Sequence, residues 1–230
     1  MTPFGTLLSV ELTKVLRRPM TWVLAAILVG FLALIYGSLT AALLAPAVEG
    51  FDPSDLRAQV LLPNGFGFGL SIATGVGTVL VVILAASVYG SEFSWGTVRT
   101  MLRARAGRTR LVVGKLVLVE LAALVVPLLG VVVGIVAPLL IGLVIGESVP
   151  ASSWATTDFF TDALFDSLRA FVAIGTWALI GAIVTLLTHS LATGLGITLA
   201  LYFVGDAMLG LIAQAGDVGT WIARLFPNQA

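Results

Sequence analysis

The stretch LVLVELAALVVPLLGVVVGIVAPLLIGLVI, residues 116–145, decides the fold class of this chain. A helix needs about 20 predominantly apolar residues to cross the hydrocarbon core of a bilayer. This stretch is longer than that and contains a single ionisable side chain, Glu120. It is too long for a strand of a membrane barrel, which has about ten residues of alternating polarity. The stretch therefore predicts a membrane-spanning helix.

Apolar stretches of similar character recur on both sides of this segment. They cover residues of about 20–45, 65–90, 170–188 and 191–213, and the polar turn Thr188-His189-Ser190 separates the last two. Of the 230 residues, 59% are hydrophobic and 10% are charged, whereas soluble domains have about 25% charged residues. We therefore predict an all-α, polytopic membrane helix bundle, with five visible spans in a single transmembrane domain over residues 1–230.

Positive charge is distributed unevenly between the predicted loops. If the spans alternate in direction, nine Lys and Arg residues lie on one side of the membrane and three lie on the other. Cytoplasmic loops carry an excess of these residues, so we expect the N-terminus in the cytoplasm. The acidic loops at about 46–64 and 146–169 are then expected to face outward.

Residues 1–19 predict an amphipathic helix that lies in the plane of the membrane interface. A basic amphipathic helix next to a span lies among the lipid head groups, and Pro19 then turns the chain into the bilayer. The alternative is a frayed segment that only sets the orientation of the first span. The apolar residues on one face are Leu8, Leu12, Val15 and Leu16, and the charged residues of this interfacial helix are Glu11, Lys14, Arg17 and Arg18.

The segment EFSWGTVRTMLRARAGRTRLVVGK, residues 92–115, holds six of the twelve basic residues of the chain. A loop that only fixes orientation would explain its arginines, but neither its length nor its opening Glu and Gly-Thr. The residues at helical spacing on one face are Glu92, Trp95, Arg99 and Arg103. We expect the second span to continue into the cytoplasm as a charged helix, Gly107 to break it, and a second helix to begin at Arg108.

Known signatures of chemistry do not occur in the sequence. Gly114-Lys115 is followed by leucine and is not preceded by the spaced glycine of a phosphate-binding loop. One histidine and no cysteine leave no pair for zinc, and no nucleophile elbow is present. We therefore expect no catalytic site, no metal and no cofactor on this chain. We also expect no nucleic-acid binding, because no aromatic platform accompanies the arginines.

Two carboxylates fall inside predicted spans, Glu120 and Asp206. Intramembrane ionisable residues mark substrate or proton pathways, so both are candidates for a translocation path. The alternative is a carboxylate that is protonated or hydrogen-bonded and faces the bundle. Glycines at a spacing of four, such as Gly130 and Gly134, predict close helix contacts, which we expect within the subunit rather than at a dimer seam.

Residues 89–116, YGSEFSWGTVRTMLRARAGRTRLVVGKL, resemble the loop between the second and third spans of ABC-2-type transporter permeases. The N-terminal ELTKVLRRP is similar to the opening of that family, through Glu11, Lys14, Arg17 or Arg18, and Pro19. The matching loop positions are Glu92, Gly96, Thr97, Arg99, Arg108 and Gly114-Lys115.

The resemblance implies the permease subunit of an ATP-driven exporter in the cytoplasmic membrane of a bacterium. It implies a second permease subunit, six spans where five are visible, and a separate cytoplasmic ATPase that binds ATP and Mg²⁺. The segment 91–115, the coupling loop, would dock on that ATPase. Its coupling residues are Glu92, Trp95, Gly96, Thr97, Arg99, Arg103, Arg105, Arg108 and Lys115. The alternatives are a proton-coupled secondary transporter that uses Asp206 or Glu120, and a membrane scaffold that transports nothing.

Overall fold

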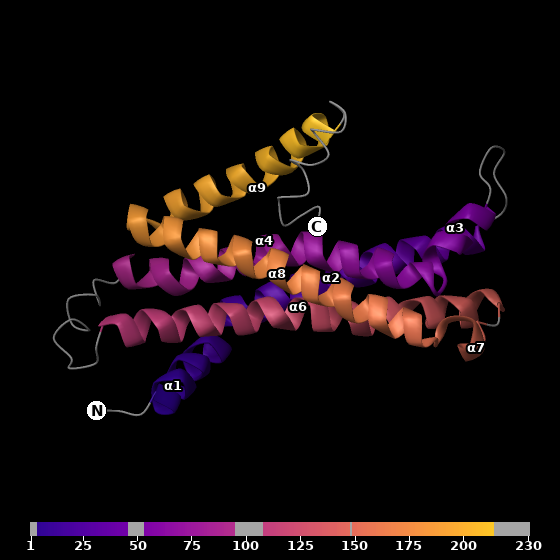
Figure 1. Cartoon of the computed structure of the whole chain (residues 1–230), viewed down its shortest axis with the longest axis horizontal. Coiled ribbons are helices and arrows are strands. Elements are labelled where there is room, and N and C mark those ends of the chain that lie inside the picture. The colour runs from indigo at the N-terminus through magenta and orange to yellow at the C-terminus, as the bar shows by residue number, and fades with distance from the viewer. Residues whose placement is uncertain (1–3, 46–52, 95–107, 148, 214–230) are drawn as a thin grey trace. The chain divides into compact units, whose positions relative to one another are not determined.

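A computed structural model describes residues 4–45, 53–94, 108–147 and 149–213, and within these ranges every regular element is a helix (Figure 1). The predicted all-α fold is thus confirmed. The helices are α1 (Phe4–Arg17), α2 (Pro19–Leu44), α3 (Pro53–Val60), α4 (Asn64–Ser94), α6 (Arg108–Ile145), α7 (Ala151–Trp154), α8 (Thr157–Thr188) and α9 (Leu191–Ala213).

Four of these helices are long enough and apolar enough to cross a membrane. The four stretches are Pro19–Leu44, Asn64–Gly90, Val112–Ile145 and Thr157–Thr188, and α9 contains a shorter apolar stretch, Leu191–Gly205. Helices satisfy all their backbone hydrogen bonds internally, which is what a segment in hydrocarbon requires. The chain is therefore a polytopic membrane helix bundle.

Helix α8 begins at Thr157, well before the apolar stretch expected from about residue 170. The Oγ1 atom of Thr156 accepts a hydrogen bond from the backbone N–H of Phe159 at 3.2 Å, which caps the helix start. Asp158 lies in the first turn, where the helix dipole favours negative charge. The apolar pattern of the sequence thus predicted the later part of this helix and not its capped beginning.

Contacts between the helices divide the chain into two compact units. Unit 1 comprises Met1–Leu24, Thr78–Leu124 and Val172–Ala230, and unit 2 comprises Ala25–Gly77 and Val125–Phe171. The long helices α4, α6 and α8 each contribute one part to each unit.

The core of unit 2 consists of two apolar clusters. One centres on Leu62, Phe66, Leu70, Ala163 and Ala170, and the other on Tyr36, Leu43, Val60 and Ile141. A Cβ atom at Gly134 would lie 3.0 Å from the carbonyl oxygen of Phe66, and one at Gly130 would lie 2.9 Å from Leu70 Cδ1. These two glycines therefore pack within the chain, as the sequence predicted.

The short helices α3 and α7 lie at the same end of unit 2 (Figure 1). Arg57 of α3 donates a hydrogen bond from Nη1 to Oε1 of Glu147 at 2.8 Å, just after the end of α6. Trp154 of α7 makes an edge-to-face contact with Phe159, which makes another with Phe66. Polar and aromatic contacts thus join the connecting segments to the spans at this end.

In unit 1, side chains of α2 cap the end of α1. The Oγ1 atom of Thr21 donates to the carbonyl of Val15 at 2.7 Å, and Nε1 of Trp22 donates to the carbonyl of Leu16 at 2.8 Å. The last carbonyls of a helix have no partner inside the helix, so these two bonds fix the angle at which α1 meets α2. Pro19, the first residue of α2, has no backbone N–H and so leaves no unpaired donor at the start of the helix.

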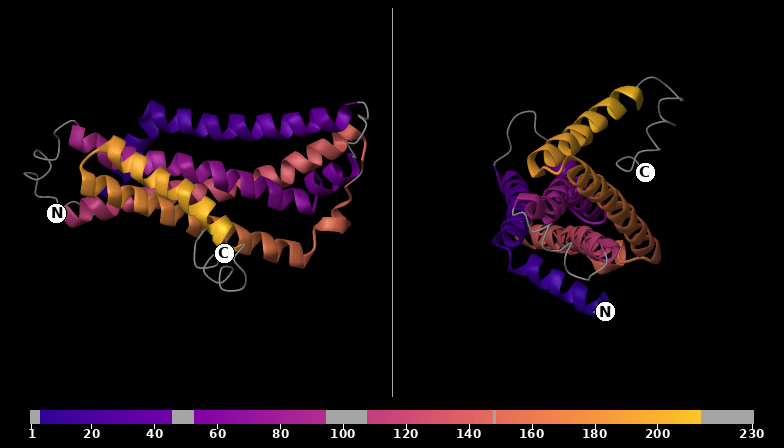
Figure 2. Two further views of the ribbon diagram at one scale, coloured as in Figure 1. Left: turned by 90° about the horizontal axis from the view of Figure 1, so that it is seen from above. Right: turned by 90° about the vertical axis from the view of Figure 1, so that its left-hand side faces the viewer.

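Helices α8 and α9 form a hairpin, in which α9 folds back from the end of α8 (Figure 2). His189 occupies the turn with a φ of 53°, and Ser190 Oγ accepts a hydrogen bond from the backbone N–H of Thr193 at 3.3 Å. The serine is thus the N-cap of α9. The turn expected at residues 188–190 is confirmed.

We expect Gly134→Leu to destabilise the protein by about 1–3 kcal/mol, because a side chain cannot enter without moving the backbone of Phe66. The measurement is thermal unfolding in detergent, followed by fluorescence-detected size exclusion. Gly30→Leu is the matched control, since no atom lies within 4 Å of a Cβ atom at that position. Identical melting curves for the two variants would contradict the packing of α6 on α4.

Candidate functional site

The described ends of α4 and α6 frame the coupling loop. Glu92 lies in the last turn of α4, and Arg108 is the first residue of α6. Six predicted coupling residues lie outside the described residues: Trp95, Gly96, Thr97, Arg99, Arg103 and Arg105. In Figure 1 the last turn of α4 and the first turn of α6 lie at the same end of unit 1.

Lys115 lies inside unit 1 and is only 2% exposed. Its Nζ atom donates a hydrogen bond to the carbonyl of Val88 on α4 at 3.2 Å. The same atom lies 5.5 Å from the centroid of the Tyr89 ring, within the range of a cation–π contact. The sequence pattern groups Lys115 with the arginines of the loop, but its burial within the chain gives it a different environment.

Tyr89 makes the reverse contact from α4 to α6. Its hydroxyl donates a hydrogen bond to the carbonyl of Val112 at 3.1 Å. Each helix therefore supplies one side-chain donor to a backbone carbonyl of the other. No sequence motif marked Tyr89, although a tyrosine near the end of an apolar span has a hydroxyl group that needs a hydrogen-bond partner.

Residues 84–90 of α4, before its last turn, are enclosed on every face. All residues from 84 to 90 are buried, so this part of the helix has no side that contacts solvent or lipid. A Cβ atom at Gly90 would lie 2.7 Å from Cβ of Leu191 on α9. Gly90 thus allows α9 to approach α4 directly, one residue after the contact with α6.

Helix α1, the predicted interfacial helix, buries part of one face against the protein. Leu8 and Val15 are half-buried and Glu11, between them, is buried, whereas Leu12 and Leu16 are exposed. Glu11 accepts a hydrogen bond from Lys14, which compensates the burial of its carboxylate. The apolar residues of α1 are therefore divided between a face that packs on the protein and a face that is open.

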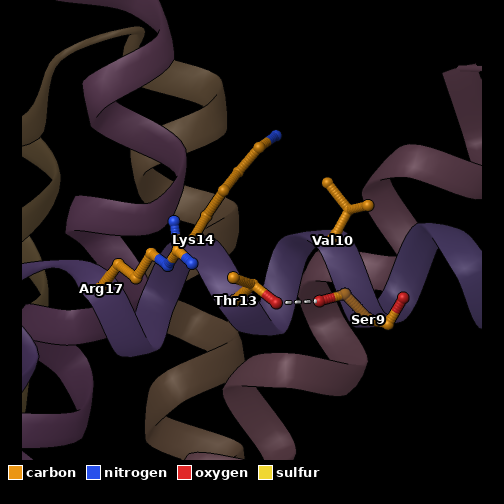
Figure 3. Close-up of a pocket in the computed structure, with 5 residues that line it drawn as sticks. All are labelled: Ser9, Val10, Thr13, Lys14 and Arg17. Carbon is orange, nitrogen blue, oxygen red and sulfur yellow. Dashed lines mark hydrogen bonds between the residues drawn. The ribbon is translucent and has the colours of Figure 1, made fainter.

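A groove of about 300 Å³ follows the exposed side of α1 (Figure 3). Its lining combines two cations, two hydroxyl groups and one apolar side chain: Lys14, Arg17, Ser9, Thr13 and Val10. Thr13 donates its hydroxyl hydrogen to the carbonyl of Ser9, the bond drawn in Figure 3. Arg18, the fourth charged residue predicted for this helix, lies just beyond its end and is half-buried.

Glu120 faces α8. A Cβ atom at Gly175 would lie 2.5 Å from its Oε2 atom, so the carboxylate occupies the space that this glycine leaves. Its Oε1 atom is buried and has no hydrogen-bond partner among the residues that the structure describes. Asp206 belongs to α9, and its side chain lies outside the described residues. Within the described ranges, no group of three His, Asp or Glu side chains is placed to hold a metal ion.

A protein-family model described as "ABC-2 family transporter protein" matches residues 7–205. The match includes most of α1, the coupling loop and Glu120, and it ends one residue before Asp206. No curated protein and no solved structure matches the chain.

We expect Gly175→Ala to destabilise the protein, because the new methyl group must displace the Glu120 carboxylate. In a Glu120→Ala background the obstacle is gone and the same substitution should cost much less, with a coupling free energy of about 1 kcal/mol. Thermal unfolding of the four proteins of this cycle measures that coupling. Gly205→Ala, with open space around its Cβ position, is the control. Equal destabilisation in both backgrounds would rule out the contact between α6 and α8.

Proposed function

Because the chain belongs to the ABC-2 family of transporter proteins, we propose that it moves its cargo outward across the membrane in response to ATP hydrolysis on another subunit. Membership makes it a multi-pass membrane permease component of an ABC transporter, distinct from the component that hydrolyses ATP. In our proposal a separate cytoplasmic ATPase holds ATP and Mg²⁺, and a second permease subunit, identical or different, completes the path. The membrane is the cytoplasmic membrane of a bacterium.

The observation that carries the proposal is the basic loop between two helices whose ends are fixed to each other. Tyr89 of α4 donates a hydrogen bond to the carbonyl of Val112, and Lys115 of α6 donates one to the carbonyl of Val88. Arginines in the segment between two joined helices suit a soluble partner, since guanidinium groups form strong, charge-assisted hydrogen bonds with carboxylates. We assign Arg99, Arg103 and Arg105 to such contacts with the ATPase.

The interfacial helix has the composition of a segment that lies among lipid head groups. Leu12 and Leu16 are exposed, 40% and 48%, and offer apolar surface to the edge of the hydrocarbon. Lys14 and Arg17, in the groove beside them, suit the phosphates of anionic lipids on the cytoplasmic leaflet. Together with the excess of basic residues on the same side, this supports a cytoplasmic N-terminus.

Glu120 is the described residue that best suits a place on the translocation path. One oxygen of this intramembrane carboxylate has no partner among the described residues, which is energetically costly. Ionisable residues inside a membrane usually mark a functional site. We propose the same role for Asp206 on the sequence alone.

We expect the triple variant Arg99→Glu, Arg103→Glu, Arg105→Glu to lose at least tenfold of the ATPase that co-purifies with the wild-type protein, since three charge-assisted contacts are reversed. Mass spectrometry of the tagged complex in mild detergent identifies a nucleotide-binding subunit and measures its amount. Arg169→Glu, an exposed basic residue in the first half of α8, is the control and should change nothing. If the wild-type protein brings down no ATPase, the coupling proposal is wrong. If the triple variant retains it, the loop is not the docking element.

The orientation can be tested with single cysteines, because the natural chain has none. We expect cysteine at Ser153 to react with a membrane-impermeant maleimide in intact cells, and cysteine at Arg103 to react only after the membrane is opened. Ser153 is exposed and lies in α7. The opposite labelling pattern would place the N-terminus outside.

A further inference from the structure

We propose that Lys115 and Tyr89 are positioning residues that lock the ends of α4 and α6 into one rigid base for the coupling loop. We call the set of Tyr89, Lys115 and the carbonyls of Val88 and Val112 the helix clamp. In this inference Lys115 does not touch the ATPase; it ensures that a force on the loop moves the spans. That the ATPase supplies this force rests on the proposed function, whereas the contacts of the clamp are independent of it.

The clamp is reciprocal in its hydrogen bonds. Lys115 of α6 donates to Val88 of α4, and Tyr89 of α4 donates to Val112 of α6. The two donors are neighbours, because the ammonium group also lies against the Tyr89 ring. A helix carbonyl already accepts one backbone N–H, and its second lone pair remains for a side-chain donor. The contact is thus built without breaking either helix.

The chemistry of Lys115 indicates that register matters at this point. Burying an ammonium group is costly, and an apolar side chain of similar volume would pack at least as stably. A lysine near a membrane surface could also extend its charge into the head-group region. At 2% exposure Lys115 does not extend into the head-group region, and its Nζ atom donates to the carbonyl of Val88 on the neighbouring helix. An apolar contact lets two helices slide or rotate against each other, whereas a hydrogen bond to one carbonyl fixes their register.

The clamp lies where movement would pass from the loop to the spans. The buried residues 84–90 of α4 have no free face. Gly90 brings α9 against the same turn through Leu191, and Gly181 of α8 lies against Val82. Within unit 1, a displacement of the clamped ends must therefore be shared by α4, α6, α8 and α9. Without the clamp, the end of α6 could twist alone.

If Lys115 and Tyr89 are positioning residues, their loss should impair the transmission of movement to the spans without weakening ATPase binding. A purely structural role would affect both. Lys115→Met removes the ammonium group and keeps the length of the side chain, and Tyr89→Phe removes the hydroxyl and keeps the ring. We expect both variants to bind as much ATPase as the wild-type protein. We expect the ATP-driven shift of the spans to fall about tenfold in Lys115→Met, the size expected when a hydrogen bond from a charged group is lost, and by less in Tyr89→Phe, which loses a bond between neutral groups. Arg169→Met, which removes an exposed cation elsewhere, is the matched control.

The first test does not involve the ATPase. Spin labels on cysteines at Ser94 and Val113 report the distance between the ends of α4 and α6 by pulsed electron paramagnetic resonance in lipid nanodiscs. We expect a narrow distribution in the parent and in Arg169→Met, and a broader one in Lys115→Met and in the double variant with Tyr89→Phe. An unchanged width in the double variant would overturn the clamp. If Lys115→Met is not monodisperse, an unchanged width of the distance distribution in Tyr89→Phe alone would overturn the clamp.

The second test uses the complex with the co-purified ATPase. Labels at Val113 and Phe203 report on α6 and α9, and the probe is ATP with Mg²⁺ and orthovanadate, which traps the closed ATPase. We expect a shift of the distance in the parent complex and about a tenth of its amplitude in Lys115→Met and in the double variant with Tyr89→Phe, at equal ATPase content. A full shift in the clamp variants would overturn the inference and leave the proposed function standing. A parent that binds no ATPase would overturn the proposed function, and the first test would still decide the clamp.

Discussion

A chain in hydrocarbon has no water to satisfy its backbone, so every amide and carbonyl must find a partner within the protein. Long helices meet this constraint along their length, and the remaining difficulty is concentrated at their ends. The structure meets it there with side chains: Thr21 and Trp22 cap α1, Thr156 caps α8 and Ser190 caps α9. These four side chains thus supply hydrogen bonds at positions where a helix cannot supply its own.

A second consequence of the same solvent is that apolar burial does little to hold helices together, since lipid tails are as apolar as leucine. Close approach and specific hydrogen bonds take its place. Gly134 and Gly175 admit Phe66 and Glu120 into van der Waals contact, and Lys115 and Tyr89 add directed bonds between α4 and α6. In our proposal the buried lysine anchors the base of the coupling loop, and the loop arginines contact the ATPase.

Hydropathy was sufficient to predict the helical class and the apolar part of each long helix, because bilayer thickness sets a length that is visible in the sequence. It did not predict that α8 starts at Thr157, since a helix outside the apolar stretch is marked by its cap. It also grouped Lys115 with the loop arginines, because charge alone does not reveal on which face of α6 a side chain lies. For α1, periodicity grouped Leu12 with Val15, and it did not reveal that Glu11, which accepts a hydrogen bond from Lys14, is buried.

The early start of α8 has a mechanical meaning. Its 32 residues rise about 48 Å, and the hydrocarbon core is about 30 Å thick, so the helix is longer than the layer it crosses. Under the proposed topology the surplus is the acidic first part, which stands in the water outside the cell and carries the exposed Asp158 and Asp162. Because α8 continues unbroken from this outer part into the bilayer, a displacement of its outer end would be transmitted to its membrane-spanning part. Under this topology, an antibody or a cationic peptide that binds the outer part could therefore act on the spans from outside the cell.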